Sequence, residues 1–257
     1  MEKRIKRIIP CLFYKNGFLI RSRNFILHQN IGNFINQAER FFEWDVDEMI
    51  CVNIGNQLAN DSLELISMKK IIKKISKNCF LPLTVGGKIK NLNQAINLIR
   101  SGADKFVINT KIFENNRLIT EISNMLGSQA VVASIDYKIV DKKEILFIKN
   151  GSQNTKTNIY SWIKNCEDLG VGEFFLNSID RDGSGKGYDI RTINKVKKIT
   201  KLPVIACGGA SKNEDFLELF KETDIDAAAA GNFFHFKENS YPNLKKFLKN
   251  NKINIKR

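Results

Sequence analysis

Short apolar runs alternate along the chain with longer segments that carry apolar residues at helical spacing. The runs are rich in β-branched and aromatic side chains, which predicts strands. Eight runs lie at 7–13, 48–54, 81–85, 105–109, 130–136, 173–179, 202–207 and 226–231. Helix patterns lie between or after them at 33–44, 91–102, 115–127, 161–170, 190–200 and 213–222.

Strands that alternate with helices predict a parallel sheet of the α/β class. A chain of 257 residues has the usual size of a closed (β/α)8 TIM barrel, and we expect this fold. An open doubly wound sheet is the alternative. No G-x-G-x-x-G motif follows the first run to support it.

The chain contains a long internal repeat. The phrases LPLTVGGKIK at 81–90 and LPVIACGGAS at 202–211 share a Leu-Pro start, an apolar run and a Gly-Gly pair. Four pairs of positions recur 122 to 125 residues apart: Phe13 and Asp136, Glu48 and Glu173, Gly86 and Gly208, and Asn109 and Asn232. Matched strand ends in the same order predict two similar half-barrels, about 1–125 and 126–257, within one domain spanning 1–257.

Composition narrows the class of protein. Hydrophobic residues make up 43% and charged residues 26%, as in ordinary soluble domains. We read no signal peptide and no apolar run of membrane-spanning length, so we expect a cytoplasmic protein without a membrane partner. Five cysteines without a C-x-x-C motif predict free thiols. They are Cys11, Cys51, Cys79, Cys166 and Cys207.

The formal net charge is +14. A basic chain predicts an anionic partner, although the many Lys, Ile and Asn residues also fit the coding bias of an AT-rich genome. The basic residues are spread along helices rather than gathered in an aromatic-laced patch. We therefore expect a small phosphorylated ligand and no nucleic acid. No metal or cofactor is predicted.

The Gly-Gly pairs end strands on opposite sides of the predicted barrel, and barrel active sites lie at the carboxyl ends of strands. A Gly-Gly pair is either a simple turn or a place where backbone N–H groups approach an anion. The paired arrangement favours two phosphate sites and a substrate with a phosphate at each end. The candidates are Gly86, Gly87, Asn109 and Thr110 for one site, and Gly208, Gly209, Gly231 and Asn232 for the other.

Three carboxylates end strands at the same predicted edge. Asp136 ends the fifth strand, where it acts either as a general acid or base or as a cap of the next turn. Asp180 and Asp182 follow the sixth strand in SIDRDGSGKGYD, and at least one is expected to act on the substrate. His28 and His235 are expected to be structural.

Several motifs together resemble one known family. They are KRIIPCL, TVGGKI, GADKFVINT, GSQAVVASID, LNSIDRDGSGKGYD, LPVIACGGA and FFHF. From about residue 4 to the C-terminus the chain is similar to the cyclase subunit of imidazole glycerol phosphate synthase, the HisF family. The resemblance implies a lyase of histidine biosynthesis. Such a subunit converts the two-phosphate ribonucleotide PRFAR to imidazole glycerol phosphate and AICAR, using ammonia from a HisH-like glutaminase at the barrel bottom.

The resemblance also implies an ammonia gate at the starts of four strands. Arg7, Glu48, Lys105 and Glu173 occupy the family's gate positions. Ordinary ion pairs at a barrel bottom are the alternative interpretation.

The carboxyl ends of the strands depart from the family pattern. The resemblance implies two catalytic aspartates, at the ends of the first and fifth strands, and Phe13 replaces the first while Asp136 matches the second. Strand alternation places Phe13 on the same face as Arg7, toward the barrel interior. Asn53 and Arg21 replace a family Asp and Lys at substrate-binding positions, and Asp182 is a second catalytic candidate.

A retained gate and an altered upper site predict a diverged copy. We expect it to accept ammonia for amidation of a surface-polysaccharide sugar, where an acetamido group becomes an acetamidino group. A true cyclase of histidine biosynthesis is one alternative. A non-catalytic barrel that activates the glutaminase and conducts ammonia is the other.

Overall fold

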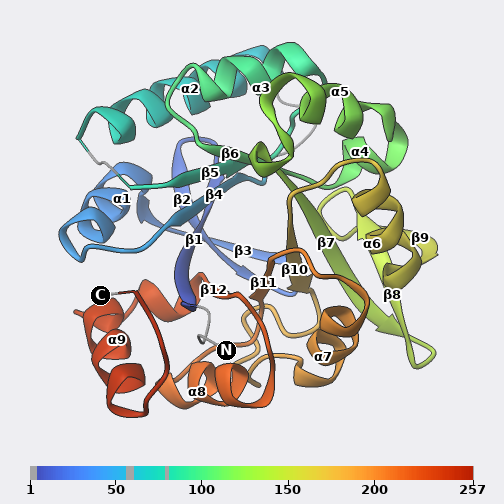
Figure 1. Cartoon of the computed structure of the whole chain (residues 1–257). Coiled ribbons are helices and arrows are strands. Elements are labelled where there is room, and N and C mark those ends of the chain that lie inside the picture. Colours follow the sequence, from blue (N-terminus) through green and yellow to red (C-terminus); the bar gives the residue numbers. More distant parts are fainter. Residues whose placement is uncertain (1–4, 56–60, 79–80, 257) are drawn as a thin grey trace.

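A computed structural model describes residues 5–55, 61–78 and 81–256 of the chain (Figure 1). Eight parallel strands form its centre, and all eight were predicted. They are β1 (Arg7–Lys15), β4 (Met49–Asn53), β5 (Leu83–Gly86), β6 (Lys105–Ile108), β7 (Val131–Val140), β10 (Glu173–Ser178), β11 (Val204–Cys207) and β12 (Ala227–Ala230).

The eight strands close into a barrel. Each pairs in parallel with the next, β10 pairs with β7, and β12 pairs back with β1 from Arg7 opposite Ala227 to Pro10 opposite Ala230. Closure confirms the (β/α)8 TIM barrel, and the alternative of an open sheet is wrong. The order of the strands around the barrel follows the order along the chain, because each helix returns the chain to the start of the next strand.

Helices surround the barrel as an outer layer (Figure 1). Six match predicted segments: α1 (Phe34–Glu43), α3 (Leu92–Ile99), α5 (Arg117–Leu126), α6 (Ile159–Asp168), α7 (Ile190–Ile199) and α8 (Asn213–Glu222). Not predicted were α2 (Asp61–Asn78), α4 (Thr110–Glu114), α9 (Ser240–Asn250) and two 3-10 turns, η1 (Ser128–Ala130) and η2 (Asn232–Phe234).

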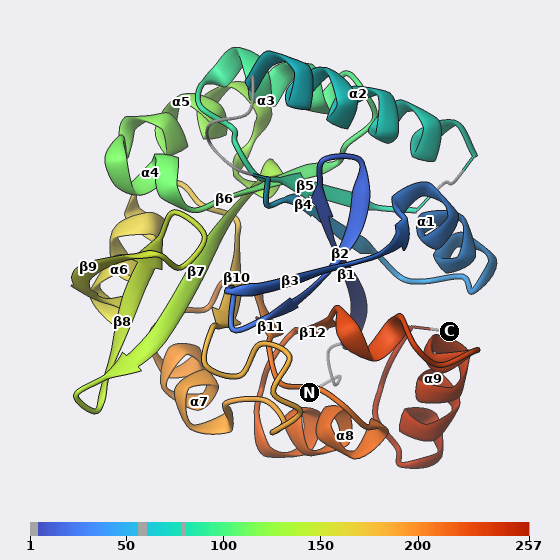
Figure 2. The same ribbon diagram turned by 180° about the vertical axis from the view of Figure 1, so that it is seen from behind.

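Two antiparallel hairpins extend the barrel beyond its carboxyl edge. After β1 the chain forms β2 (Phe18–Arg23) and β3 (Leu27–Asn33), and after β7 it forms β8 (Lys143–Ile148) and β9 (Gln153–Asn158). Figure 2 shows the first hairpin in front of the barrel. Each hairpin follows the first strand of a predicted half, so the two halves carry an insertion at the same place.

Alternating side chains divide the apolar residues of the barrel strands into two layers. One cluster fills the space between strands and helices, and a second fills the inside of the barrel. Ile9, Cys11 and Phe13 of β1 belong to the inner cluster. The expectation that Phe13 faces the interior is therefore confirmed, because residues two apart on a strand share a face.

Four cysteines of the described chain are buried and free: Cys11, Cys51, Cys166 and Cys207. Cys79 lies outside the described residues. Among the helices that are described, none is both long and apolar enough to cross a membrane.

Candidate functional site

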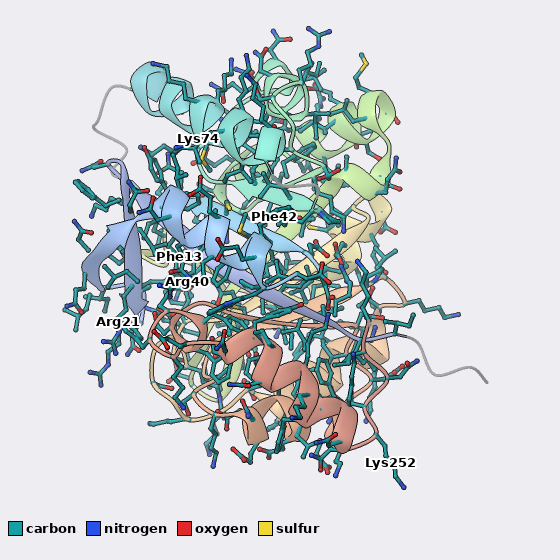
Figure 3. All side chains as sticks on the ribbon, turned by 90° about the vertical axis from the view of Figure 1, so that its left-hand side faces the viewer. Phe13, Arg21, Arg40, Phe42, Lys74 and Lys252 are labelled. Atoms are coloured by element: carbon teal, nitrogen blue, oxygen red, sulfur yellow. The ribbon has the colours of Figure 1, made fainter. Side chains whose placement is uncertain are left out.

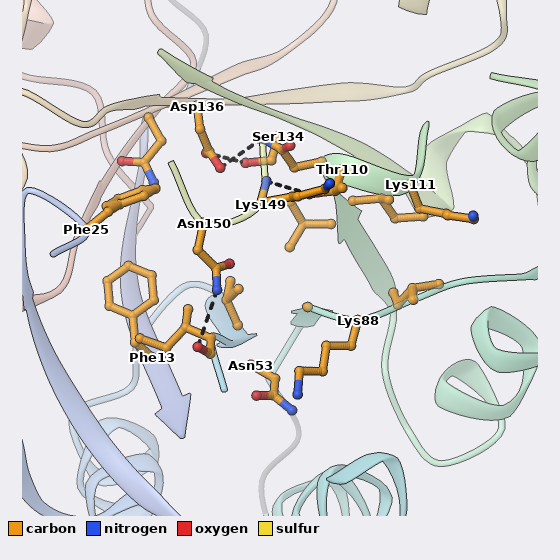
Figure 4. Close-up of a pocket in the computed structure, with 18 of the residues that line it drawn as sticks. Phe13, Phe25, Asn53, Lys88, Thr110, Lys111, Ser134, Asp136, Lys149 and Asn150 are labelled. Atoms are coloured by element: carbon orange, nitrogen blue, oxygen red, sulfur yellow. Dashed lines mark hydrogen bonds between the residues drawn. The ribbon is translucent and has the colours of Figure 1, made fainter. Parts of the chain in front are cut away.

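A cavity of about 510 Å³ opens at the carboxyl edge of the barrel (Figure 4). Its walls come mainly from β1, β4, β6, β7 and β10 and from the loops after β5 and β8. Five of the predicted site residues line it: Asn53, Gly87, Asn109, Thr110 and Asp136. Phe13 also lines it. The strand ends therefore bring together residues that lie far apart in the chain.

Asp136 is held at the base of the cavity by polar neighbours. Its Oδ1 accepts a hydrogen bond from Ser134 Oγ at 2.8 Å, and its Oδ2 accepts one from Asn109 Nδ2 at 2.8 Å. Burial raises the pKa of Asp136 to about 7, against the opposing effect of these hydrogen bonds and one from Asn177. A carboxyl group with a pKa near neutrality is able both to accept and to release a proton.

Phe13 stands where the resemblance implies the partner carboxylate. Its side chain is 7% exposed, and Val52, Phe25 and Phe175 line the same cavity. Figure 4 shows Phe13 and Asp136 on different sides of the cavity. This wall is apolar and aromatic, and it has no proton to exchange.

The first Gly-Gly pair allows two strands to approach closely. A Cβ on Gly87, whose φ is +89°, would lie 2.0 Å from the backbone oxygen of Asn53. A Cβ on Gly86 would lie 2.5 Å from the backbone oxygen of Val107. Gly86 does not line the cavity, so at least part of the reason for this pair is the packing of β4, β5 and β6.

Thr110 and Asn53 are tied into the cavity wall by local hydrogen bonds. Thr110 Oγ1 accepts from the backbone N–H of Lys149 at 2.9 Å, and Asn53 Oδ1 accepts from that of Gly55 at 2.9 Å. Asn109 Nδ2 also donates to the Phe147 carbonyl at 3.1 Å. The second hairpin is therefore joined to the end of β6 in the cavity wall.

The second predicted phosphate set and two further candidates, Arg21 and Asp182, lie outside this cavity. Gly208, Gly209, Gly231, Asn232, Arg21 and Asp182 do not line it. A Cβ on Gly209 would lie 2.0 Å from the Gly187 carbonyl oxygen. The structure thus brings three residues of the first set, Gly87, Asn109 and Thr110, together in this cavity, and the second set lies outside it.

The first hairpin forms hydrogen bonds with Asp182, the second catalytic candidate, and with Asn232 of the second phosphate set. Asp182 Oδ2 accepts from Ser22 Oγ at 2.6 Å and from the Phe25 backbone N–H at 3.2 Å. Asn232 Nδ2 donates to the Ser22 carbonyl at 2.9 Å. Burial raises the pKa of Asp182, and the hydrogen bonds from Ser22 and Phe25 oppose this.

Arg21 lies on the same hairpin but points elsewhere. Its guanidinium carbon is 5.1 Å from the ring centre of Phe236. Figure 3 shows Arg21 on the hairpin, apart from Phe13. The side chain forms a cation–π contact of moderate strength instead of lining the cavity.

Sequence reasoning missed four cations of the cavity wall: Lys88, Lys90, Lys111 and Lys149. Lys88 follows the first Gly-Gly pair directly, which is a signal that the sequence did offer. Lys149 lies in the unpredicted second hairpin, so no pattern placed it here. His28 also lines the cavity, and burial followed by the charge of Lys15 lowers its pKa. His235 packs against Phe41, and burial lowers its pKa to about 4.

The four predicted gate residues form a closed ring of alternating charge at the amino ends of the strands. Arg7 contacts Glu48 at 2.7 Å and Glu173 at 2.5 Å. Lys105 contacts Glu173 at 2.7 Å and Glu48 at 3.6 Å. Thr84 Oγ1 also donates to Glu48 at 3.2 Å. Burial disfavours the charge of Arg7, but Glu173 and Glu48 outweigh it and raise the pKa of the guanidinium.

Within the described residues, no group of three or more His, Cys, Asp and Glu side chains is arranged to hold a metal ion. The upper cavity presents a protonatable carboxyl group, amides and ammonium groups, and a ring of charged side chains lies at the other end of the barrel.

Comparison with known proteins identifies the family to which the chain belongs. A family model described as histidine biosynthesis protein matches residues 7–240. Proteins called imidazole glycerol phosphate synthase subunit HisF are similar over nearly the whole chain. Those of Hydrogenobaculum sp. (strain Y04AAS1) and Thermotoga sp. (strain RQ2) are 38% and 39% identical over 254 and 251 residues. The alignments cover 98% of this chain in both cases, and 98% and 97% of the two relatives. The chain belongs to the HisF family of imidazole glycerol phosphate synthase subunits.

Proposed function

We propose that the protein is a cytoplasmic, ammonia-accepting subunit that has diverged from the cyclase reaction. It receives ammonia from a HisH-like glutaminase at the charged ring. It supplies that ammonia at the upper cavity for amidation of a surface-polysaccharide sugar. One observation carries this proposal: the ring of four charges is complete, while Phe13 faces the cavity that contains Asp136.

The ring of four charges is suited to act as a gate because its side chains form ion pairs with one another. Each carboxylate contacts both cations, and Glu48 and Glu173 are 4% and 3% exposed. Passage of a small molecule requires that at least one of these contacts opens. A glutaminase that docks on this face is well placed to bias that opening.

The barrel interior above the ring suits neutral ammonia. The inner cluster includes Ile9, Val132 and Phe175. An isolated ion in such surroundings loses its hydration without compensation, which costs several kcal/mol. Ammonia therefore enters this interior far more readily than ammonium does.

Phe13 argues against cyclisation by the family's route. That route uses two carboxylates, and an aromatic side chain neither transfers a proton nor stabilises a cationic intermediate. Loss of one general acid–base group typically lowers a rate by about 10²–10⁴-fold. Asp136, with a pKa of about 7, remains able to accept and to release a proton in the cavity.

A true cyclase of histidine biosynthesis is the second candidate. It is favoured by 38–39% identity to the two relatives, whose names describe synthase subunits, and by Asp136 of β7, which lines the upper cavity. In this case another group would have to replace the carboxylate missing at position 13.

The two candidates are separated by two measurements on the purified full chain. We expect the cognate glutaminase to co-purify with it and to hydrolyse glutamine faster in the complex. Lys105→Met should reduce this stimulation, whereas Lys142→Met, in the turn between β7 and β8, should not. With ammonium and PRFAR, cyclisation should be far below about 1 s⁻¹.

Two results contradict the proposal. If the protein forms no complex with the glutaminase at micromolar concentrations, the proposed transfer of ammonia from the glutaminase is wrong. Cyclisation at about 1 s⁻¹ or faster, which is ordinary for enzymes, selects the second candidate. Transfer of ¹⁵N from labelled glutamine to an acetamidino sugar, in the presence of a sugar amidotransferase, distinguishes ammonia supply from mere activation of the glutaminase.

A further inference from the structure

A second cavity lies on the outer surface of the protein, between α2 and α3. Its volume is about 280 Å³, and it shares no lining residue with the upper cavity. Figure 1 shows the two helices side by side in the layer outside the barrel. We call this cavity the outer groove. Its lining consists of Lys69, Lys70, Lys73, Asn97, Arg100 and Ser101.

The outer groove is strongly cationic. Four of its six lining residues carry a positive charge, and the described lining contains no carboxylate. Within the part of the chain that the structure describes, none of these four cations forms an ion pair. Lys69 and Lys73 lie one helical turn apart on the same face of α2, where like charges repel each other. A bound anion would relieve this repulsion.

The second half-barrel provides an internal comparison, because α7 and α8 repeat α2 and α3. Ser101 Oγ donates to the Asn97 carbonyl at 2.7 Å. Thr223 Oγ1, 122 positions further along the chain, donates to the Leu219 carbonyl at the same distance. This shared hydrogen bond aligns the end of α3 with the end of α8.

The corresponding surface of the second half lacks the excess of cations. Two buried residues of α2 recur on α7 at a spacing of 121: Ile72 and Ile75 correspond to Ile193 and Val196. This spacing places Asn194 where α2 has Lys73, and Glu222 occupies the position of Arg100. The Asn194 amide donates to the Glu222 carbonyl at 3.0 Å, so a neutral contact joins α7 to α8. Packing of the repeat therefore does not require cations between the two helices.

Helix capping does not account for the cluster either. Arg100 follows the last residue of α3, where a cation stabilises the negative end of a helix. The carbonyl groups of residues 96–99 already accept hydrogen bonds from backbone N–H groups or from Ser101. Lys69, Lys70 and Lys73 lie within α2, away from its end. Capping therefore explains Arg100 at most.

Close packing fixes the two helices that carry the cations. Ser76 Oγ of α2 donates to the Ser101 carbonyl at 3.3 Å. A Cβ on Gly102, whose φ is +111°, would lie 2.4 Å from Ser76 Oγ. The end of α3 therefore lies directly against α2, and the cations of the groove are held at a set spacing by the backbone.

The size and the lining of the groove narrow the class of ligand. A volume of about 280 Å³ is at the lower limit for small-molecule sites, which favours a compact ligand. No described lining residue is aromatic, so a nucleobase finds no stacking partner. A phosphate group carries about −1.5 to −2 charges at neutral pH, so two or three linked phosphates match four cations. The guanidinium of Arg100 is suited to bind two phosphate oxygens at once.

We propose that the outer groove binds a compact anion of two or three linked phosphates, such as inorganic pyrophosphate or tripolyphosphate. The groove is separate from the upper cavity and from the ring of four charges. The inference therefore goes beyond the proposed function and does not depend on it.

Calorimetric titration of the full chain tests the proposal. The probes are pyrophosphate, tripolyphosphate, orthophosphate, citrate and a single-stranded oligonucleotide. Pyrophosphate and tripolyphosphate should bind at least about tenfold more tightly than orthophosphate and citrate, because their linked phosphates bring more charge into a small volume. The oligonucleotide should bind more weakly than tripolyphosphate, since its phosphates are spaced too far apart to enter the groove together.

The variants Lys73→Gln and Arg100→Gln should each weaken pyrophosphate binding by about tenfold or more. Lys74→Gln is the matched control, because it removes the same charge from the next residue of α2 (Figure 3), which does not line the groove. It should change the affinity by less than about twofold. Glutamine is a good helix former, and each groove variant removes one of four like charges. Both should therefore melt no lower than the wild type when no anion is present.

Three results overturn the inference. The first is citrate binding as tight as that of pyrophosphate, and the second is tighter binding of the oligonucleotide than of tripolyphosphate. The third is equal weakening by Lys73→Gln and Lys74→Gln, including no weakening by either, which would attribute binding to net charge or to another site. The titration involves neither glutaminase nor cyclisation. Failure of the groove to bind phosphate therefore leaves the proposed function standing, and failure of the proposed function leaves the groove standing.

Discussion

Asn109 Nδ2 donates to Asp136 Oδ2 at 2.8 Å, so an amide from the end of β6 fixes the carboxyl group that ends the barrel part of β7. Ser134 holds the other oxygen at 2.8 Å. Both hydrogen bonds stabilise the ionised form of the carboxyl group. Burial destabilises the ionised form by more, and it raises the pKa of Asp136 to about 7. The residue is therefore positioned firmly while remaining able to change its protonation state.

Asp136→Asn should stabilise the protein more at pH 8 than at pH 4.5. The folded protein retains a proton that the unfolded chain releases above a pKa of about 3.8. The stability that this proton provides is fully present below that value and is lost as pH rises through about 7. Asparagine stays neutral throughout. The pKa of Asp136 differs by about three units between the folded and the unfolded protein, which limits the effect on the free energy of unfolding to about 4 kcal/mol.

Guanidinium unfolding of both proteins at the two pH values measures this difference. Loss or gain of hydrogen bonds in the variant contributes equally at both values and cancels. A difference in unfolding free energy that does not change with pH contradicts the raised pKa.

Arg7→Met should destabilise the fold by about 3 kcal/mol. The change leaves Glu48 and Glu173 buried with Lys105 as the remaining cation of the ring. The loss should stay at the low end of the range for broken buried pairs, because the Arg7 side chain is 25% exposed.

Urea unfolding measures the loss, with the exposed Lys201→Met as the control for removing a cation. The control should change stability by less than about 0.5 kcal/mol. Equal effects of the two substitutions would mean that the ring does not stabilise the barrel.

The barrel strands were predictable because both of their faces are buried. A strand covered by helices on one side and by the barrel interior on the other reads as a continuous apolar run. The second strand of each hairpin does not form a continuous apolar run. Strand β9 (Gln153–Asn158) consists of polar residues, and β3 (Leu27–Asn33) has no buried position. Their pairing depends on neighbours rather than on a sequence period.

The site was predictable only as far as it follows from strand ends. Asn53, Asn109 and Asp136 each end or follow a barrel strand, so closure of the barrel gathers them. The contact of Ser22 with Asp182 joins residues 160 positions apart through a hairpin that the pattern did not reveal. For the same reason, the sequence did not place Lys149 in the cavity.

Gly87→Ala should be much more damaging than Gly17→Ala. Both glycines have φ near +90°, so both substitutions carry a conformational cost of about 1 kcal/mol. Only at Gly87 does the new Cβ meet a backbone oxygen, that of Asn53 at 2.0 Å, whereas nothing lies within 4 Å at Gly17. We expect a further loss of about 3 kcal/mol at Gly87.

Thermal and urea unfolding of the two variants provide the comparison. The difference between them isolates the close approach of β5 to β4 from the backbone conformation. Similar losses at the two positions would show that the strands separate without cost.

Phe13→Asp should recover part of the cyclase reaction. The substitution returns a carboxyl group to the cavity that already contains Asp136 and Asn109. A general acid–base group contributes about 10²–10⁴-fold, so a rise of at least about tenfold in ammonium-dependent turnover of PRFAR is expected. Recovery should be incomplete, since Asn53 and Arg21 also depart from the residues that the resemblance implies at these positions. Stability should fall by about 3 kcal/mol or more, because a buried ring is lost.

Phe13→Asn is the matched control, because it has nearly the same shape without the acid. It should lose similar stability and recover no turnover. Equal turnover by the two variants would attribute any recovery to space in the cavity rather than to proton transfer. Wild-type turnover already near 1 s⁻¹ would mean that Phe13 is compatible with cyclisation. A rise that is confined to the aspartate variant would instead support the proposal that Phe13, in place of a carboxyl group, is what prevents cyclisation by this barrel.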